Sequence, residues 1–187
     1  MRGQEPVTEV VAALEGALDV FGNIVRALAP EQLSLSTIND GWNVRDVINH
    51  VLDNEHWSMA TIEGRVWEFS LAPEFIGDDD PTTVVERTGA ALLDMARSHA
   101  ISEQAEYALT MTVIELTGHG WDIAETSGQP TDLAPDIASW CLAVAKQTLD
   151  EPGARGEFFK PAVPISDMAS AADRFAAYLG KPVAASR

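Results

Sequence analysis

The amino-acid sequence predicts an all-α protein, and three observations support this. Apolar residues recur at steps of three and four along most of the chain, which is the spacing of one helix face. Prolines, glycines and capping residues divide the chain into segments of helical length. Runs of alternating apolar and polar residues are never longer than a few positions. For 187 residues we expect one domain, 1–187, forming an antiparallel four-helix bundle with short additional C-terminal helices.

The first two helices are predicted from their ends. The apolar face of the first helix covers 7–28, and this helix should stop before Pro30, because the residue preceding a proline avoids the helical region. The second helix should start after Asn43, which is a good N-cap, and Asp46 stands where a carboxylate favours the helix dipole. It should run to about Glu63, so that two long helices precede the first extended loop.

The remaining elements are bounded by glycine, proline and acidic residues. Loops are expected over 65–80 and 152–166. The N-cap Asp80, followed by proline, opens a helix, and Gly128 is a natural left-handed end for another. The expected helices are 81–99, 105–127, 134–149 and 169–179.

The net charge limits the classes of partner. The chain has 29 acidic and 12 basic residues, which gives a net charge of −17. Nucleic-acid binding depends largely on lysine and arginine displacing counterions from phosphates, so we expect no nucleic-acid partner. The same charge opposes docking on anionic lipid.

The location follows from the apolar segments and the cysteine content. The sequence start lacks an apolar signal core, and no run is long enough to span a bilayer, so we expect a cytoplasmic protein without membrane partners. The single cysteine, Cys141, lies in the apolar run 140–144 without a basic neighbour in sequence. We expect a buried, unreactive thiol there.

A polar stripe runs along the expected helix 105–127. Its members are spaced at three and four: Thr112, Glu115, His119, Asp122 and Thr126. One interpretation, which spacing alone favours, is a solvated face with a weak Glu–His pair. The other is that Glu115 and His119, on adjacent turns, bind one divalent metal ion. Both interpretations stay open at this point.

Two glycines flank the histidine of this stripe. Gly118 and Gly120 should each cost the helix about 1 kcal/mol relative to alanine. They could allow tight packing of a neighbouring helix, or the close approach of a substrate to the backbone. The sequence supports the two explanations equally.

A metal ion would need a third protein ligand, which directs attention to the other histidines. His99 ends a helix, where capping explains it. His56 and His50 are six residues apart and therefore point in different directions. His50 lies on the side of its helix that carries Asn54 and Trp57. Spacing alone favours an exposed His50 over a ligand.

Two segments resemble a known family. WNVRDVINHVLDNE, 42–55, and IELTGHGWDIAETSGQP, 114–130, resemble the metal-binding domain of mycothiol-dependent maleylpyruvate isomerases and their actinobacterial relatives. These belong to the DinB-like superfamily of four-helix bundles. The segment 159–181 resembles the end of shorter relatives, and 65–110 is the least similar part. The W…RD…H motif and the E-x-x-x-H motif together indicate this family more specifically than either motif alone.

The resemblance implies a metal site. Its ligands would be His50, Glu115 and His119, and such a set leaves open positions of the kind found at catalytic sites. Zinc suits these nitrogen and oxygen ligands best, with nickel and iron as alternatives. The resemblance also implies mycothiol as a cosubstrate. Trp57 and Asn54, on the side of His50, are then expected to line the cofactor pocket.

The resemblance implies a metal-dependent thiol transferase or isomerase, with a small-molecule thiol and a second substrate as partners. We also expect the chain to form a homodimer. Alternatives are a dimeric metal- or ligand-binding bundle without turnover, and a metal-dependent hydrolase. The isomerases have a further C-terminal domain, whereas this chain ends after one short helix, so the isomerase reaction itself is not implied. Arg45 and Arg65 are the nearest candidates for binding an anion.

Overall fold

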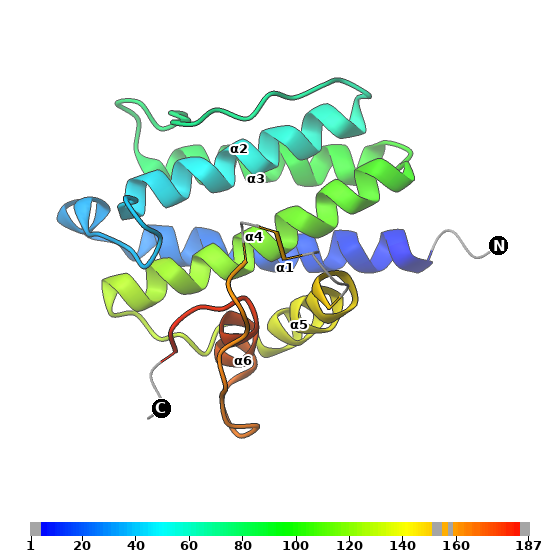
Figure 1. The fold of residues 1–187 in the computed structure, drawn as a ribbon. Coiled ribbons are helices and arrows are strands. Elements are labelled where there is room, and N and C mark those ends of the chain that lie inside the picture. Colours follow the sequence, from blue (N-terminus) through cyan, green and yellow to red (C-terminus); the bar gives the residue numbers. More distant parts are fainter. Residues whose placement is uncertain (1–4, 151–154, 157–158, 184–187) are drawn as a thin grey trace.

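The computed structural model describes residues 5–150, 155–156 and 159–183 and is all-helical over these residues, as predicted (Figure 1). The elements are α1 (Glu5–Arg26), the 3-10 helix η1 (Pro30–Ser34), α2 (Val44–Ile62), α3 (Pro81–Ser98), α4 (Glu103–Ser127), α5 (Pro135–Leu149) and α6 (Ala171–Tyr178). The only pairing of strand type among the described residues is an isolated bridge between Ser36 and Asn43. None of the described helices combines the length and the hydropathy needed to cross a membrane.

The predicted helix ends are close to those observed. Asn43 caps α2 by accepting a hydrogen bond from the backbone N–H of Asp46 (3.0 Å), and the Asp46 carboxylate accepts one from the Asn43 N–H (2.9 Å). Gly128 ends α4 in the left-handed region, at φ 76°. α4 starts two residues earlier than predicted, because Ser102 caps it, and η1 was not predicted. Part of the predicted loop 152–166 lies outside the described residues.

Helices α1 to α4 form the bundle, in which α1 packs on α3 and α4, and α2 packs on the same two helices. Helices α1 and α4 run in one direction, and α2 and α3 run antiparallel to them (Figure 1). The loop after α2 runs back along that helix: Asp53 accepts a hydrogen bond from Trp67 Nε1 (2.8 Å), and Asn49 accepts one from the Phe75 N–H (2.7 Å). As a result α3 starts beside the start of α2 and runs in the same direction.

Helix α4 lies at the centre of the molecule, because α5 and α6 cover the part of it that the other bundle helices leave free. Trp121 of α4 is fully buried and donates through Nε1 to Asp173 of α6 (2.9 Å). Cys141 of α5 is buried near Thr117, and burial raises the pKa of its thiol to about 12. The predicted burial of this cysteine is therefore confirmed, and the raised pKa is consistent with an unreactive thiol.

The two glycines of α4 allow close packing on opposite sides of the helix. A Cβ atom at Gly120 would lie 3.2 Å from Cδ1 of Ile24 in α1. A Cβ atom at Gly118 would lie 3.2 Å from Cδ1 of Leu179, just after α6. Tight packing therefore accounts for Gly120. Gly118 serves packing too, but it also lines the cavity described below.

Candidate metal centre

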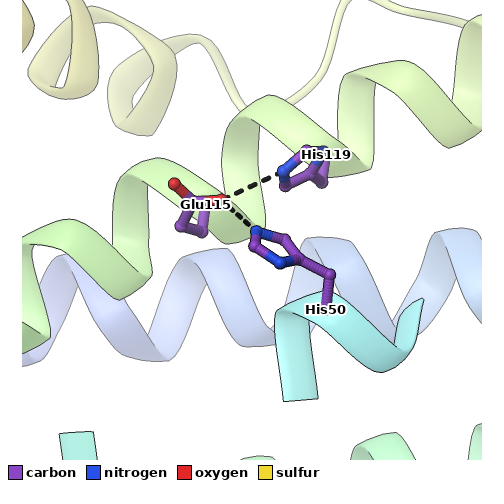
Figure 2. A group of neighbouring side chains, drawn as sticks. All are labelled: His50, Glu115 and His119. Atoms are coloured by element: carbon purple, nitrogen blue, oxygen red, sulfur yellow. Dashed lines mark hydrogen bonds and ion pairs between the residues drawn. The ribbon is translucent and has the colours of Figure 1, made fainter. Parts of the chain in front are cut away.

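Three side chains converge between the middle of α4 and the first half of α2. Nε2 of His50 lies 3.1 Å from Oε2 of Glu115, and Nε2 of His119 lies 3.0 Å from the same oxygen (Figure 2). One ligand atom from each residue lies within 4.8 Å of the other two. The side chains of His50, Glu115 and His119 are 29%, 17% and 13% exposed. The structure thus brings the three predicted residues together, while metal binding itself stays a prediction.

Two of the sequence interpretations prove wrong in this setting. His50 is partly buried and contacts Glu115, so it is not the exposed surface histidine that its spacing favoured. The polar stripe of α4 is not a solvated face either, because Thr112 and Asp122 are fully buried. The stripe faces α2 and the C-terminal tail. Tertiary packing determines what a helix face contacts, and helical periodicity alone does not.

Hydrogen bonds keep the Glu115 carboxyl group ionised. Burial alone would raise the pKa of Glu115, but hydrogen bonds from His119 and His50 outweigh burial and hold that pKa well below its usual range. For His119, burial would lower the pKa, whereas hydrogen bonds to Asp122 and Glu115 raise it above its usual value. Glu115 is therefore a carboxylate at neutral pH and can act as an oxygen ligand.

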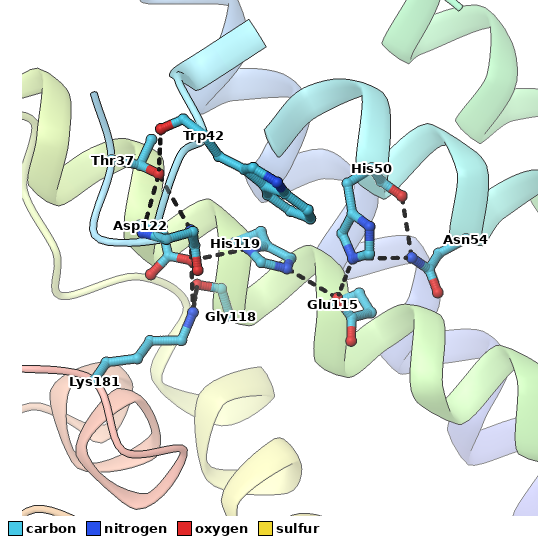
Figure 3. A network of polar contacts seen from close by, with 10 residues as sticks. Thr37, Trp42, His50, Asn54, Glu115, Gly118, His119, Asp122 and Lys181 are labelled. Atoms are coloured by element: carbon cyan, nitrogen blue, oxygen red, sulfur yellow. Dashed lines mark hydrogen bonds and ion pairs between the residues drawn. The ribbon is translucent and has the colours of Figure 1, made fainter. Parts of the chain in front are cut away.

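Asp122 sets the orientation of His119. Its Oδ2 lies 2.8 Å from Nδ1 of His119 and accepts a hydrogen bond from Nζ of Lys181 (2.6 Å), as Figure 3 shows. The same oxygen accepts a hydrogen bond from Nδ2 of Asn39 (3.1 Å). Burial would raise the pKa of Asp122, but the charge of Lys181 and the hydrogen bond from His119 lower it to about 2. An ionised carboxylate only accepts, so Nδ1 of His119 carries the proton. Nε2 of His119 donates to the Glu115 carboxylate (3.0 Å), and a metal ion bound between the two would replace that proton.

The donor set fits a divalent ion. Two imidazole nitrogens and one carboxylate oxygen are the ligands of many catalytic zinc sites, which keep a further position open. The Asp122–His119 contact is also the arrangement usual for metal-bound histidines, whose second ring nitrogen donates to a carboxylate. On the other helix, the amide of Asn54 donates to the main-chain oxygen of His50 (3.0 Å) and lies 3.3 Å from its Nε2. Both histidines are thus held in place by a neighbouring side chain.

A cavity of about 550 Å³ adjoins the three residues, within the range usual for small-molecule sites. Most of its lining is apolar: Ile38, Trp42, Met111, Ile114, Phe159, Leu179 and Pro182. The indole of Trp42 lies 4.8 Å from the ring of His50 and 6.2 Å from that of His119, between ring centroids. The centre is therefore open on one side to a pocket with largely apolar walls.

The other predicted site residues lie elsewhere. Trp57 is not among the lining residues of this cavity and packs near Phe69 and Tyr107 at the far end of α2. Asn54 does not line it either, although it contacts His50. Arg45 pairs with Glu74 (2.9 Å), away from the cavity.

The remaining candidates also lie outside the cavity, each with partners of its own. Arg65 donates to Glu63 (2.6 Å). Nδ1 of His56 lies 2.7 Å from the main-chain oxygen of Leu52, and His99 caps α3.

Sequence reasoning missed two residues of the site. Lys181 reaches Asp122 from 59 positions along the chain, and Asn39 approaches from the segment before α2. No local spacing could have identified either contact. Asp122 itself could have been singled out, since it follows His119 by three residues on the same helix face.

Comparisons with known proteins bear on the family of the chain. A family model described as "Mycothiol maleylpyruvate isomerase N-terminal domain" matches residues 14–108. Two uncharacterized proteins of Mycobacterium tuberculosis, from strains CDC 1551 and H37Rv, are each 27% identical over 184 residues, covering 91% of this chain and 97% of the relative. No solved structure matches the chain. The family match extends through 65–108, where the visible resemblance is weakest, and it ends before Glu115.

Proposed function

Because the chain belongs to the mycothiol maleylpyruvate isomerase N-terminal domain family, whose fold is DinB-like, we propose that it is a metal-dependent enzyme that activates a low-molecular-weight thiol for transfer or isomerisation. The observation that carries the proposal is the convergence of His50, Glu115 and His119 beside a cavity with largely apolar walls. Mycothiol is the thiol that the family description suggests. Zinc is the ion that the donor set suits best, with nickel or iron as alternatives.

Each residue of the centre has a distinct task in this proposal. His50, Glu115 and His119 would hold the ion, which would lower the pKa of a small thiol so that its sulfur becomes a nucleophile. Asp122 keeps a proton on Nδ1 of His119, so that Nε2 is the ring nitrogen that would bind the ion. Trp42, whose indole lies near both imidazole rings, would limit the access of water to them.

Metal analysis tests the ligand set. We expect about one equivalent of divalent metal per chain in the purified wild type. The variants His50→Ala and His119→Ala should lose most of this metal. His56→Ala is the control on the same helix, because its ring points away from the centre and stacks on Phe75. Full metal retention by both ligand variants would refute the ligand set.

Cobalt substitution tests the thiol chemistry, since zinc is spectroscopically silent and cobalt(II) accepts similar ligands. Mycothiol added to the cobalt-loaded protein should produce a saturable near-ultraviolet sulfur-to-cobalt charge-transfer band. The band should be absent from His119→Ala, which loses its metal. An unchanged spectrum while cobalt stays bound would reject thiol activation. A hydrolase, or a binding protein without turnover, would then be the better candidate.

A further inference from the structure

A second cavity lies at the end of α2, away from the metal centre. Its volume is about 400 Å³, and it shares no lining residue with the cavity beside that centre. Its lining combines two aromatic residues, one acid and two neutral polar residues: Trp57, Tyr107, Glu103, Thr61 and Gln104. Trp57, which the sequence predicted to line the cofactor pocket, lies here instead. The proposed function gives none of these five residues a role.

The rings of Trp57 and Tyr107 form a corner of this second cavity. Their centroids are 6.3 Å apart and their planes meet at 82°, so that each ring stands nearly perpendicular to the other. Tyr107 is 57% exposed and Trp57 is partly buried, which leaves both rings accessible to a ligand. The face of an aromatic ring is electronegative and attracts cations that approach within about 6 Å of its centroid. Two perpendicular rings offer such faces to one small group.

The charges around the second cavity are negative. Glu103 is exposed in the lining and forms no ion pair with any residue that the structure describes. Glu106 adds a second negative charge in the first turn of α4. The start of α4 carries a partial positive charge of about half a unit, which these two carboxylates outweigh. No lysine or arginine lines the cavity, and Arg65, just after α2, pairs with Glu63.

We propose that the second cavity binds a small organic cation with a methylated ammonium group. The faces of Trp57 and Tyr107 would hold its methyl groups, and the carboxylate of Glu103 would balance its charge. A primary ammonium ion suits the site less well, because it is strongly hydrated and the lining offers it a single carboxylate. The inference is independent of the proposed function, since no ligand of the metal centre lines this cavity.

The test compares choline with 3,3-dimethylbutan-1-ol, a neutral molecule of the same shape, by ligand-observed NMR titration of the full chain. The wild type should bind choline about tenfold more tightly, as expected for two aromatic faces and one exposed carboxylate. Trp57→Leu should remove this preference, because leucine keeps an apolar side chain without an aromatic face. Glu103→Gln should reduce the preference to about threefold, since an exposed charge pair contributes little.

Three variants serve as controls, and each should keep the preference of the wild type. Trp140→Leu removes another partly buried tryptophan, and Asp136→Asn removes an exposed carboxylate from the first turn of another helix, α5. Neither residue lines the second cavity. His119→Ala alters the metal centre, from which the cation site is separate.

The inference is overturned if choline does not bind, if the two probes bind equally, or if the preference survives in Trp57→Leu. An unchanged preference in Glu103→Gln would also overturn it, and this exposed substitution tests the site whether or not Trp57→Leu folds. An equal loss in Asp136→Asn would show that the net charge of the chain attracts choline. A loss in His119→Ala would place the cation at the metal centre. Either of these two results would refute a cation site at Trp57.

Discussion

Asp122 connects three parts of the chain through one oxygen atom. Its Oδ2 accepts hydrogen bonds from His119 on the same helix, from Lys181 in the tail and from Asn39 before α2. The second oxygen, Oδ1, is buried without a hydrogen bond to any described residue. An asparagine could therefore place its NH₂ group at the Oδ1 position and keep the acceptor, while losing the charge.

We accordingly expect Asp122→Asn to weaken metal binding by about 10- to 100-fold, the usual effect of changing the partner of a metal-bound histidine. Competition with a chelator of known affinity measures this, and thermal unfolding of the metal-free protein shows whether the fold is intact. Asp132→Asn, an exposed carboxylate outside the cavity, is the matched control. Equal affinity in Asp122→Asn and wild type would show that Asp122 does not position His119.

Glu55 is a buried acid outside the centre. It is fully buried on α2, and neither carboxylate oxygen bonds to any described residue. Burial raises its pKa from 4.5 to about 8. Between these values the unfolded chain releases the proton and the folded chain keeps it, so the stability of the protein falls as pH rises through this range.

Glu55→Gln should remove this pH dependence. Near pH 4.5 the variant and the wild type should be similarly stable, and above pH 8 the variant should be more stable by roughly 3–5 kcal/mol. Urea unfolding at several pH values between these limits measures the difference. Glu68→Gln, which changes an exposed carboxylate, is the control. A difference that does not vary with pH would contradict a proton held by Glu55.

At the residue level, the sequence allowed part of the site to be predicted. The four-residue step from Glu115 to His119 places both side chains on one helix face whatever the tertiary fold. The direction in which His50 points depends on how α2 packs on α4, and spacing alone suggested the wrong answer. Lys181 could not have been assigned, because only the packing of the tail on α4 brings it to Asp122.

At the scale of elements, α4 is the helix on which the others pack. Gly120 faces Ile24 and Phe21 of α1, both buried core residues, whereas a Cβ atom at Gly22 within α1 would meet no atom within 4 Å. Alanine substitutions at these two glycines therefore separate the effect of packing from that of helix propensity, because the gain in helix propensity is the same at both positions.

Gly22→Ala should raise the free energy of unfolding by about 1 kcal/mol, which is the difference in helix propensity. Gly120→Ala should give no gain, because its methyl group would have to displace Ile24 in a closely packed core. Denaturant unfolding of both variants beside the wild type makes the comparison. An equal gain from both substitutions would rule out a packing role for Gly120.

The helix ends were predictable because caps act locally, as Asn43, Asp80 and Gly128 illustrate. The relative direction of α2 and α3 was not predictable in this way. It depends on buried polar side chains of α2, Asn49 and Asp53, which bind the returning loop along its length. In the sequence these two residues look like ordinary polar positions of a surface helix.

For the whole molecule, the charge of −17 governs interactions at long range. We expect no binding to duplex DNA or RNA at physiological salt, because nearly all phosphate affinity comes from basic clusters. A mobility-shift assay at micromolar protein tests this, and a salt-dependent shift would contradict it. The homodimer and the cytoplasmic location expected from the sequence stay predictions, and sedimentation equilibrium checks the first.

The position of Trp42 has a practical consequence for work on this protein. Its indole is 4.8 Å from His50 and 6.2 Å from His119, between ring centroids. Ions with unpaired d electrons, such as cobalt(II) or copper(II), quench the fluorescence of an indole at such short range, whereas zinc does not. The protein thus carries an intrinsic fluorophore at its candidate metal centre. Emission lost in the wild type but retained in Trp42→Phe would identify the signal, and metal exchange could be followed without a label.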